Sequence, residues 1–395
     1  EAWDILKTYQ GRIPIIACDT LVKPMNDRGI YPDFFTALER DPIVADFFRG
    51  QPINERTTLL APSLLLPESW KCFEGRKLSY CATPPYSVNL DLLHLGAVSP
   101  GSSAGNLNIA MASWMGFETV IMIGHNLAFA HGTFESHVKG TIDKNREAHR
   151  SEEEMRKMAT GGKVPTQDGE SEVYTIMEYT LFKRQIEGAI ASAPQMTFIN
   201  TAAKGQKIQG AKYMPLPKAV EQYYKEDFDL YPELLKALES HTQEMADRRI
   251  HRSFKRLEKT IEAIESFEKK STEMHEKLVT WRKEIEQAEA GGEKFSLVQL
   301  NKRLDEVLSL KVAGVNEDAA FSAGFIGVIS PVHIVFERSI NDLLGKHTND
   351  YDLKKDFLLQ HEKYFTIWNK WLPRIKEVYL KTIDRIRGVL PEQPE

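Results

Sequence analysis

One stretch of the chain constrains its fold more than any other: residues 100–129, PGSSAGNLNIAMASWMGFETVIMIGHNLAF. It opens with a loop of small residues, Gly101 to Gly105, and continues with apolar residues at helical spacing from Asn106 to Met115. Gly116 stands where a C-terminal cap is expected. Val120 to Ile123 is an unbroken apolar run, typical of a parallel strand that is covered on both faces. A loop, a helix and a buried strand in this order predict an α/β sheet.

The same stretch predicts a site for an anion. Residues with little side-chain bulk allow a phosphate or ribose to approach the backbone N–H groups that open the helix. The turn after the strand is polar, and open α/β sheets bind ligands at the carboxyl ends of their strands. Candidate nucleotide-binding residues here are Ser102, Ser103, Gly105, Asn106 and Asn126. Such helix and strand pairs also occur in proteins that bind nothing there, so the pattern alone leaves both interpretations open.

Short apolar runs alternate with helical patterns up to about residue 225. The strand candidates besides 120–123 are Ile13–Cys18, Phe34–Leu38, Thr58–Ala61, Leu78–Cys81 and Met196–Ile199. Strands that are separated by helices form parallel sheets. We therefore expect an α/β fold: a Rossmann-like parallel sheet domain over residues 1–225, followed by an all-α helical bundle domain over 226–395.

Polar residues follow several of these strand candidates. If the strands are parallel, these side chains line one edge of the sheet, and we take six of them as candidate contacts to a nucleotide: Asp19, Thr20, Glu39, Arg40, Asn200 and Thr201. Asp, Asn and Thr also cap helices, which is the ordinary role of any one of them alone. Together with the turn at residues 125–126, polar residues follow four of the predicted strands, and this recurrence favours a shared site.

The first residues read as a helix with no strand before it. Glu1 to Tyr9 carries apolar residues at helical spacing and leads directly into the first strand candidate. In a doubly wound sheet, a strand and its loop normally precede such a helix. We expect the first strand of this domain to lie before Glu1.

The composition changes after Tyr223, where charged residues become dominant. Eight apolar residues between Leu257 and Ile285 recur at spacings of three, four and seven, which predicts a long amphipathic helix or a helical hairpin. Gly291 and Gly292 interrupt the pattern, and further helices are expected over 297–310, 332–344 and 357–389. Packing is the ordinary role of such helices, and holding a protein partner is a second interpretation.

Charge and cysteine usage exclude several classes of protein. With 51 basic and 56 acidic residues and a formal net charge of −5, no nucleic-acid-binding surface is expected over the whole molecule. The three cysteines form no CxxC pair, which fits a reducing cytoplasm, and no apolar run is long enough for membrane insertion.

We expect no cofactor and no metal. The triplet from Asp227 to Asp229 resembles a metal-binding DxD motif, but it lies at a helix start, where capping is the commoner role.

Four ordered blocks carry a resemblance to a known family. The run SSAGNLNIAMASWMGFETVIMIGHNLAF, with IPIIACDTLVKPMNDRGIYPDFFTALERD upstream and SHVKG and INTAAKGQKIQG downstream, resembles the central domain of motility accessory factor (Maf) proteins. These are bacterial flagellin glycosyltransferases, and their central domain is similar to that of bacterial sialyltransferases that use CMP-activated sugars. The resemblance covers roughly residues 1–215.

The resemblance implies a reaction and its partners. A nonulosonic acid of pseudaminic or legionaminic type would pass from its CMP-activated form to serine or threonine hydroxyls of flagellin. The acceptor hydroxyl must lose a proton, and an imidazole suits this near neutral pH, which makes His137 the first candidate base and His125 the second.

Two other functions stay open. One is a 6-hydroxymethylpterin diphosphokinase that uses ATP and magnesium, because such enzymes are distantly related to this domain. The other is a protein that escorts flagellin without chemistry.

Overall fold

The computed structural model describes residues 2–82, 92, 95–129, 140–141, 153, 157, 159–316, 335–336, 338–343, 346 and 349–388. They form two compact units. The first takes in the chain up to Ala82 and Leu95–Ser240, and the second begins at His241.

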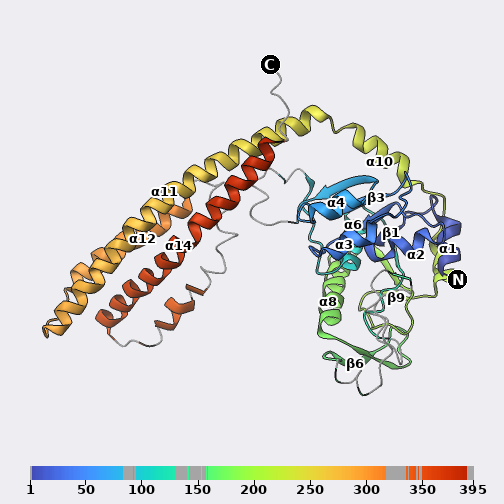
Figure 1. Ribbon diagram of the computed structural model, residues 1–395. Coiled ribbons are helices and arrows are strands. Elements are labelled where there is room, and N and C mark those ends of the chain that lie inside the picture. Colours follow the sequence, from blue (N-terminus) through green and yellow to red (C-terminus); the bar gives the residue numbers. More distant parts are fainter. Residues whose placement is uncertain are drawn as a thin grey trace. The chain divides into compact units, whose positions relative to one another are not determined.

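Unit 1 contains the parallel strands that the sequence predicts (Figure 1). Four of them form one parallel sheet in the order β1 (Ile16–Cys18), β2 (Phe34–Thr36), β3 (Thr58–Pro62) and β4 (Arg76–Tyr80). A second parallel sheet has the order β5 (Thr119–Met122), β8 (Thr197–Asn200) and β9 (Lys212–Tyr213). All six predicted strands are present, with ends that shift by no more than a few residues. The α/β class of the fold is confirmed.

Helices cover both faces of the four-stranded sheet. One face packs on α1 (Ala2–Tyr9), α2 (Val22–Asn26), α3 (Ile43–Phe48) and α4 (Pro67–Cys72). Ala17 of β1 points to this side, and so does Ile15, which directly precedes the strand. The other face packs on α6 (Ala104–Trp114) and α10 (Leu230–Glu239), with Ile16 on that side. This alternation along β1 buries both faces of the strand, as parallel sheets require.

The helix predicted at residues 106–115 is α6, and it ends as the sequence indicates. Gly116 has φ +81°, and the backbone N–H of the following Phe117 donates to Ala112 O at 3.3 Å, which closes the last turn. One apolar residue of this helix is not buried: Trp114 is 63% exposed.

The strand β5 is less buried than its sequence predicts. Val120 and Ile121 are half-buried, and Ile123 is 37% exposed. The reason is that β5 is the edge strand of its sheet, since it pairs with β8 among the described residues and an open cleft borders its other edge.

Three further elements complete unit 1. An antiparallel hairpin that the sequence analysis did not predict joins β6 (Gly162–Pro165) to β7 (Glu172–Thr175). Helix α8 (Met177–Ser192) contacts α6 and buries Ile186 and Ile190 against β8, and helix α9 (Leu216–Tyr223) contacts β5.

Unit 2 contains long helices, as predicted. A single helix, α11 (Gln243–Ala290), takes the place of the predicted helix or hairpin, and it ends at Gly291. It is followed by α12 (Leu297–Asn316) and α14 (Asp350–Arg387), and residues 338–343 are also helical. The predicted apolar seam of α11 is buried, apart from a half-buried Trp281.

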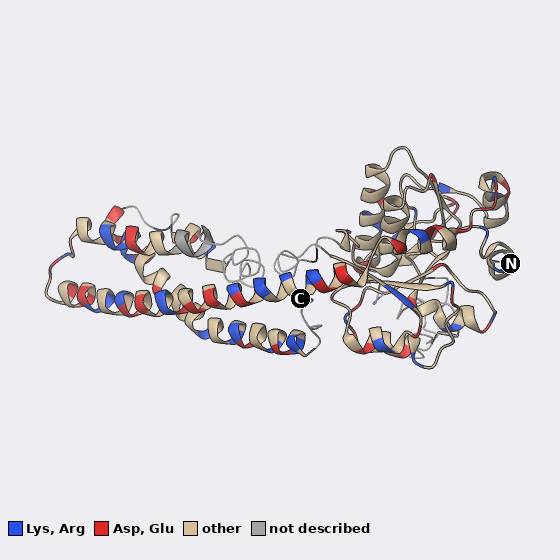
Figure 2. Ribbon diagram, turned by 90° about the horizontal axis from the view of Figure 1, so that it is seen from above, with Lys and Arg blue, Asp and Glu red and all other residues tan. Residues whose placement is uncertain are grey.

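Ion pairs show the relative direction of α11 and α14. Along α11, Glu268 pairs with Lys376, and Arg282 pairs with Glu362, so α14 runs antiparallel to α11. Figure 2 shows acidic and basic residues interleaved along the helices of this unit. The core between them includes Phe267, Leu278 and Trp368. No helix within the described ranges is long and apolar enough to cross a membrane.

Candidate functional site

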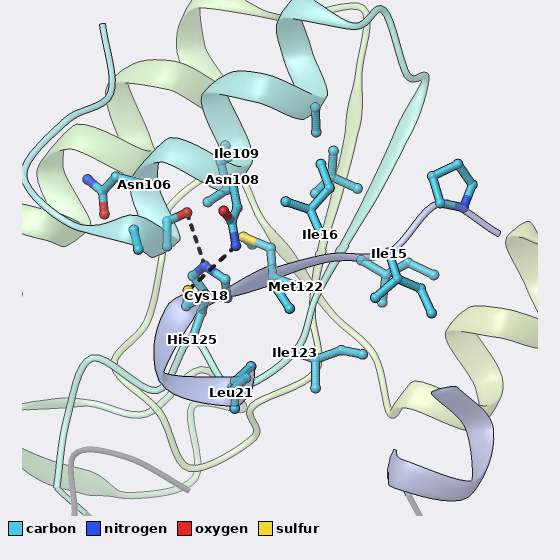
Figure 3. A pocket seen from close by; sticks show the side chains of 18 of the residues that line it. Ile15, Ile16, Cys18, Leu21, Asn106, Asn108, Ile109, Met122, Ile123 and His125 are labelled. Carbon is cyan, nitrogen blue, oxygen red and sulfur yellow. Dashed lines mark hydrogen bonds between the residues drawn. The ribbon is translucent and has the colours of Figure 1, made fainter. Parts of the chain in front are cut away.

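A cleft of about 2190 Å³ opens in unit 1, between the carboxyl ends of β1 and β5 and the start of α6 (Figure 3). Nine of the predicted site residues line it: Asp19, Thr20, Glu39, Ser102, Ser103, Gly105, Asn106, His125 and Asn126. These nine residues line the part of the cleft at the carboxyl ends of β1 and β5, and we call this part the rim site. The small-residue loop and the polar residues after β1 therefore lie on the same edge of the sheet, as the nucleotide interpretation requires.

The start of α6 presents free backbone donors to the rim site. Ser103 is the N-cap, and its Oγ accepts from the backbone N–H of Asn106 at 3.1 Å. Among the described residues, the N–H groups of Ala104 and Gly105 have no hydrogen-bond partner. Together with the positive end of the helix dipole, they form a site that favours an anion.

Two residues that were predicted to meet the ligand are bound to α8 instead. Gln185 Oε1 accepts from the backbone N–H of Ser102 and from Nδ2 of Asn106, each at 2.8 Å. Gln185 Nε2 also donates to Ser102 Oγ at 2.8 Å, and Asn106 is 6% exposed. The side chain of Asn106 thus holds α6 against α8, and Ser102 is free for a ligand only after Gln185 releases it.

Asp19 is buried at the end of β1, where it begins a short 3-10 helix, η1 (Asp19–Leu21). It is 6% exposed, and its Oδ1 accepts from the backbone N–H of Thr20 at 2.8 Å. Burial is the main cause that raises the pKa of Asp19 to about 7; the Thr20 N–H lowers this pKa and the nearby Glu39 raises it. Asp19 can therefore donate as well as accept a hydrogen bond near neutral pH.

His125 lies beside the start of α6. Its Nε2 is 3.5 Å from the Gly105 carbonyl oxygen, and its Nδ1 is buried without a hydrogen-bond partner in the described part of the chain. Burial lowers the pKa of His125, and the carbonyl groups of Gly105 and Ile123 oppose this shift. The imidazole is therefore neutral at pH 7, and it lies at the end of the rim site where α6 begins.

Three predicted contacts do not line the cleft: Arg40, Asn200 and Thr201. Arg40 is exposed. Asn200 is fully buried, where it donates to Gln167 Oε1 at 3.1 Å and accepts from the backbone N–H of Ala202, while Thr201 Oγ1 donates to Met122 O at 3.0 Å. Both polar side chains join structural elements, so their position at the end of β8 reflects structural hydrogen bonding. His137 lies outside the described residues.

The sequence analysis missed two polar residues: Asn108, which lines the cleft, and Gln185, which binds Ser102 and Asn106 at its edge. Asn108 projects from α6 toward the ends of β1 and β2. Thr36 Oγ1, on β2, donates to its Oδ1 at 2.5 Å, and its Nδ2 lies 3.6 Å from Cys18 Sγ, on β1 (Figure 3). Burial raises the pKa of the Cys18 thiol to about 12, which makes it a poor nucleophile. A polar residue on the buried side of an apolar helix was the signal for Asn108, whereas nothing near Gln185 in the sequence indicated its role.

The acidic triplet has the structural role that the sequence favours. Asp229 is the N-cap of α10, where its Oδ1 accepts from the backbone N–H of Tyr231 at 3.1 Å, and it also pairs with Arg56. Asp227 pairs with Arg12 at 2.6 Å. Within the described ranges, no three His, Cys, Asp or Glu side chains are grouped so that they could hold a metal ion.

Comparison with known proteins gives two matches. The sequence profile of the family described as 6-hydroxymethylpterin diphosphokinase MptE-like matches residues 1–132. Among solved structures, the chain is similar to the Maf glycosyltransferase from Magnetospirillum magneticum AMB-1, with 15% sequence identity and a TM-score of 0.50. The chain shares the fold of this Maf glycosyltransferase. The match covers 96% of the present chain and 54% of the other, so this chain spans about half the length of that protein. No functionally curated protein matches the sequence.

Proposed function

We propose that the chain is a glycosyltransferase that moves a nonulosonic acid, of pseudaminic or legionaminic type, from its CMP-activated form to serine or threonine hydroxyls of flagellin. The observation that carries this proposal is the pair of free amides at Ala104 and Gly105, which open into the rim site beside the neutral His125. The fold that the chain shares with a Maf glycosyltransferase supports it.

The leaving group fits the start of α6. When the bond between the anomeric carbon and the phosphate oxygen breaks, the electron pair and the developing charge stay on the phosphate of CMP. The N–H groups of Ala104 and Gly105 stabilise that charge together with the helix dipole. His125 lies at this end of the site and can donate a hydrogen bond from Nε2 to the phosphate in place of the Gly105 carbonyl.

The carboxyl groups of Asp19 and Glu39 suit the hydroxyl groups of the ribose. The two follow neighbouring strands of the same sheet, β1 and β2, and both line the rim site. A protonated Asp19 donates to one hydroxyl oxygen, while a carboxyl oxygen of Glu39 accepts from another. We assign cytidine recognition to this part of the rim site, with Thr20 beside it.

The acceptor needs a base on the side of the sugar opposite the phosphate. His125 does not suit this role, because its Nδ1 is enclosed and its Nε2 lies against Gly105. We assign the base to His137, which takes the hydroxyl proton as the acceptor oxygen attacks the anomeric carbon. One displacement of this kind inverts the configuration at that carbon.

The helices of unit 2 are the proposed site for flagellin. Their interleaved charges and long exposed faces suit a protein partner (Figure 2). The reaction would take place in the cytoplasm, before the flagellum is assembled, and motility would depend on it.

Mass spectrometry of flagellin tests the proposal directly. Flagellin is co-expressed with the donor pathway and with the wild-type chain, with His137→Ala, or with the control His241→Ala, which changes an exposed histidine of unit 2. Wild type and control should add the sugar mass to flagellin, and His137→Ala should slow transfer by about 10²- to 10⁴-fold. Unmodified flagellin that still co-purifies with the wild-type chain would contradict an enzymatic role and favour an escort.

The family match over residues 1–132 supports a second candidate, a 6-hydroxymethylpterin diphosphokinase. Calorimetry separates the two. A transferase should bind CMP without magnesium and more tightly than ATP, whereas a diphosphokinase should bind ATP with magnesium and convert 6-hydroxymethylpterin to its diphosphate.

A further inference from the structure

The cleft continues past the start of α6 on the side away from β1. Asn108 projects from α6 toward Cys18 of β1, whereas Nδ2 of Asn106 donates to Phe182 O on α8 at 3.1 Å (Figure 3). Side chains two residues apart on a helix point in nearly opposite directions, because each residue turns the helix by about 100°. The residues of α8 that line the cleft therefore lie across the start of α6 from the end of β1.

Five residues, three of them aromatic, line this second part of the cleft, which we call the aromatic arm: Phe129, Ile176, Glu178, Tyr179 and Phe182. The ring of Tyr179 neighbours both other rings, with its centroid 5.3 Å from that of Phe129 and 6.1 Å from that of Phe182. Phe129 is 6% exposed, while Tyr179 and Phe182 are half-buried. The arm thus offers a partly open apolar surface, as pockets for small molecules do.

The turn after β5 joins the aromatic arm to the rim site. All residues from His125 to Phe129 line the cleft. Leu127 has a φ of +47°, which is uncommon for a residue with a side chain, and Thr175 Oγ1 donates to its carbonyl oxygen at 2.9 Å. The N–H of Phe129 donates to Tyr174 O at 2.9 Å. Two hydrogen bonds to β7 therefore hold this strained turn in place, so the wall of the arm is preformed.

The polar groups of the two parts of the cleft differ. The rim site offers the carboxyl groups of Asp19 and Glu39, whereas the five side chains of the arm carry two polar groups, the carboxylate of the exposed Glu178 and the hydroxyl of Tyr179. A cytosine ring needs donors and acceptors fixed along one edge, and the arm presents mainly ring faces. Such faces suit the C–H groups of a sugar and the methyl of an N-acyl group, because an aromatic face carries partial negative charge. The arm therefore matches an acylated sugar better than a nucleobase.

The free amides of Ala104 and Gly105 lie between the two parts of the cleft. In a nucleotide-activated sugar, the phosphate likewise lies between the nucleoside and the glycosyl group. With the phosphate at the start of α6 and the ribose at Asp19 and Glu39, the glycosyl group extends toward α8.

We infer that the aromatic arm binds the glycosyl group of the donor and selects sugars that carry N-acyl groups. Phe129, Tyr179 and Phe182 pack on the acyl methyl groups, and the exposed Glu178 accepts a hydrogen bond from an amide N–H or a hydroxyl group of the sugar. This inference rests on the proposed function, because it takes a CMP-activated sugar as the donor.

Calorimetry tests the inference with three ligands: CMP, CMP-N-acetylneuraminic acid, and the analogue of the second ligand in which a hydroxyl group replaces the acetamido group. The wild type should bind the N-acetylated donor about fourfold more tightly than the hydroxyl analogue, which is the effect of burying about one methyl group. In Phe182→Ala this preference should fall below about twofold, with the affinity for CMP unchanged.

The matched control is Leu181→Ala. Leu181 precedes Phe182 on α8, is 48% exposed and does not line the cleft, so this variant should keep the wild-type preference. Thermal unfolding checks that each variant is folded. Phe182→Leu keeps an apolar side chain at the contact with α6 but removes the ring, and it should show the same reduced preference if Phe182→Ala does not fold.

Two results would overturn the inference while the proposed function stands. One is equal affinity of the wild type for the two donors, each bound no more tightly than CMP. The other is a folded Phe182 variant that loses affinity for CMP itself, since this would place cytosine in the arm. A wild type that binds none of the three ligands would contradict the proposed function, and this inference with it.

Saturation-transfer NMR gives an independent measurement. When CMP-N-acetylneuraminic acid binds the wild type, its acetyl methyl protons should receive strong saturation from the protein. In Phe182→Ala this signal should be lost while the cytosine protons keep theirs, and Leu181→Ala should resemble the wild type. An acetyl signal that is the same in all three proteins would place the acyl group outside the arm and overturn the inference.

Discussion

Replacing Asp19 with asparagine should make the protein more stable at alkaline pH and change its stability little at acid pH. The substitution conserves shape, because an amide oxygen can still accept from the Thr20 N–H as Oδ1 does at 2.8 Å. It removes only the ionisation of a carboxyl group that is 6% exposed.

The sign follows from proton binding in the two states. Burial raises the pKa of Asp19 from 3.8 to about 7, so between about pH 4 and pH 7 the folded chain holds a proton that the unfolded chain has released. Wild-type stability falls as the pH rises through this window. A shift of about three pH units corresponds to about 4 kcal/mol, which is the largest gain that Asp19→Asn should show above pH 7.

Native-state hydrogen exchange in the buried strand β3 measures the unfolding free energy of unit 1 separately from that of unit 2. The free-energy difference between Asp19→Asn and wild type should grow by up to about 4 kcal/mol between about pH 4 and about pH 8. The control is Asp41→Asn, because this exposed residue lines the same cleft and caps its own turn through Ile43 N–H. A flat difference across this range, or one that grows toward acid pH, would refute the assignment of Asp19 as a buried, partly protonated acid.

Three further outcomes are expected from the structure. Gly105→Ala places a Cβ 3.1 Å from His125 Nε2, so CMP affinity should fall by about tenfold in calorimetry, while Gly188→Ala, with open space around the new Cβ, should leave it unchanged. Gln185→Leu frees the backbone N–H of Ser102, which a phosphate oxygen can then accept without displacing the glutamine. CMP should bind about fivefold tighter, the effect of about one hydrogen bond, and weaker binding would contradict this. Asp229→Ala removes a helix cap and an ion pair, so thermal unfolding should report a loss of about 1 to 2 kcal/mol with CMP affinity unchanged, and a magnesium-dependent loss of affinity would indicate a metal role instead.

Local patterns predicted the elements of this fold well. The strands at residues 58–62 and 197–200 are apolar runs that stay buried in the sheet, and the apolar seam of α11 repeats with the helical period. Gly116 adopts the left-handed conformation that a helix end requires. Each of these features depends on residues within one or two turns of chain, so a single sequence contains the information.

The roles of polar side chains were harder to predict, because their partners are distant in sequence. Asn200 and Thr201 stand at the end of a strand, as site residues do, yet their hydrogen bonds go to Gln167 and Met122. Asn106 begins a helix beside the rim site, yet its amide group binds α8. A polar residue at a strand end satisfies either a ligand or a structural partner, and only the tertiary fold decides which.

Gln185 shows how a structural partner can bind the same donors that a ligand would bind. Its Oε1 accepts two N–H groups at the start of α6, one from the backbone of Ser102 and one from the side chain of Asn106. A phosphate oxygen would accept from the same donors, so the glutamine amide fills the position that a ligand oxygen would take. Exchanging one acceptor for another costs little free energy, whereas leaving the amide group of the buried Asn106 without an acceptor would cost about 1 to 3 kcal/mol. The loop can therefore keep the shape of an anion site while no anion is bound, and the free amides of Ala104 and Gly105 remain as the first contacts for an incoming phosphate.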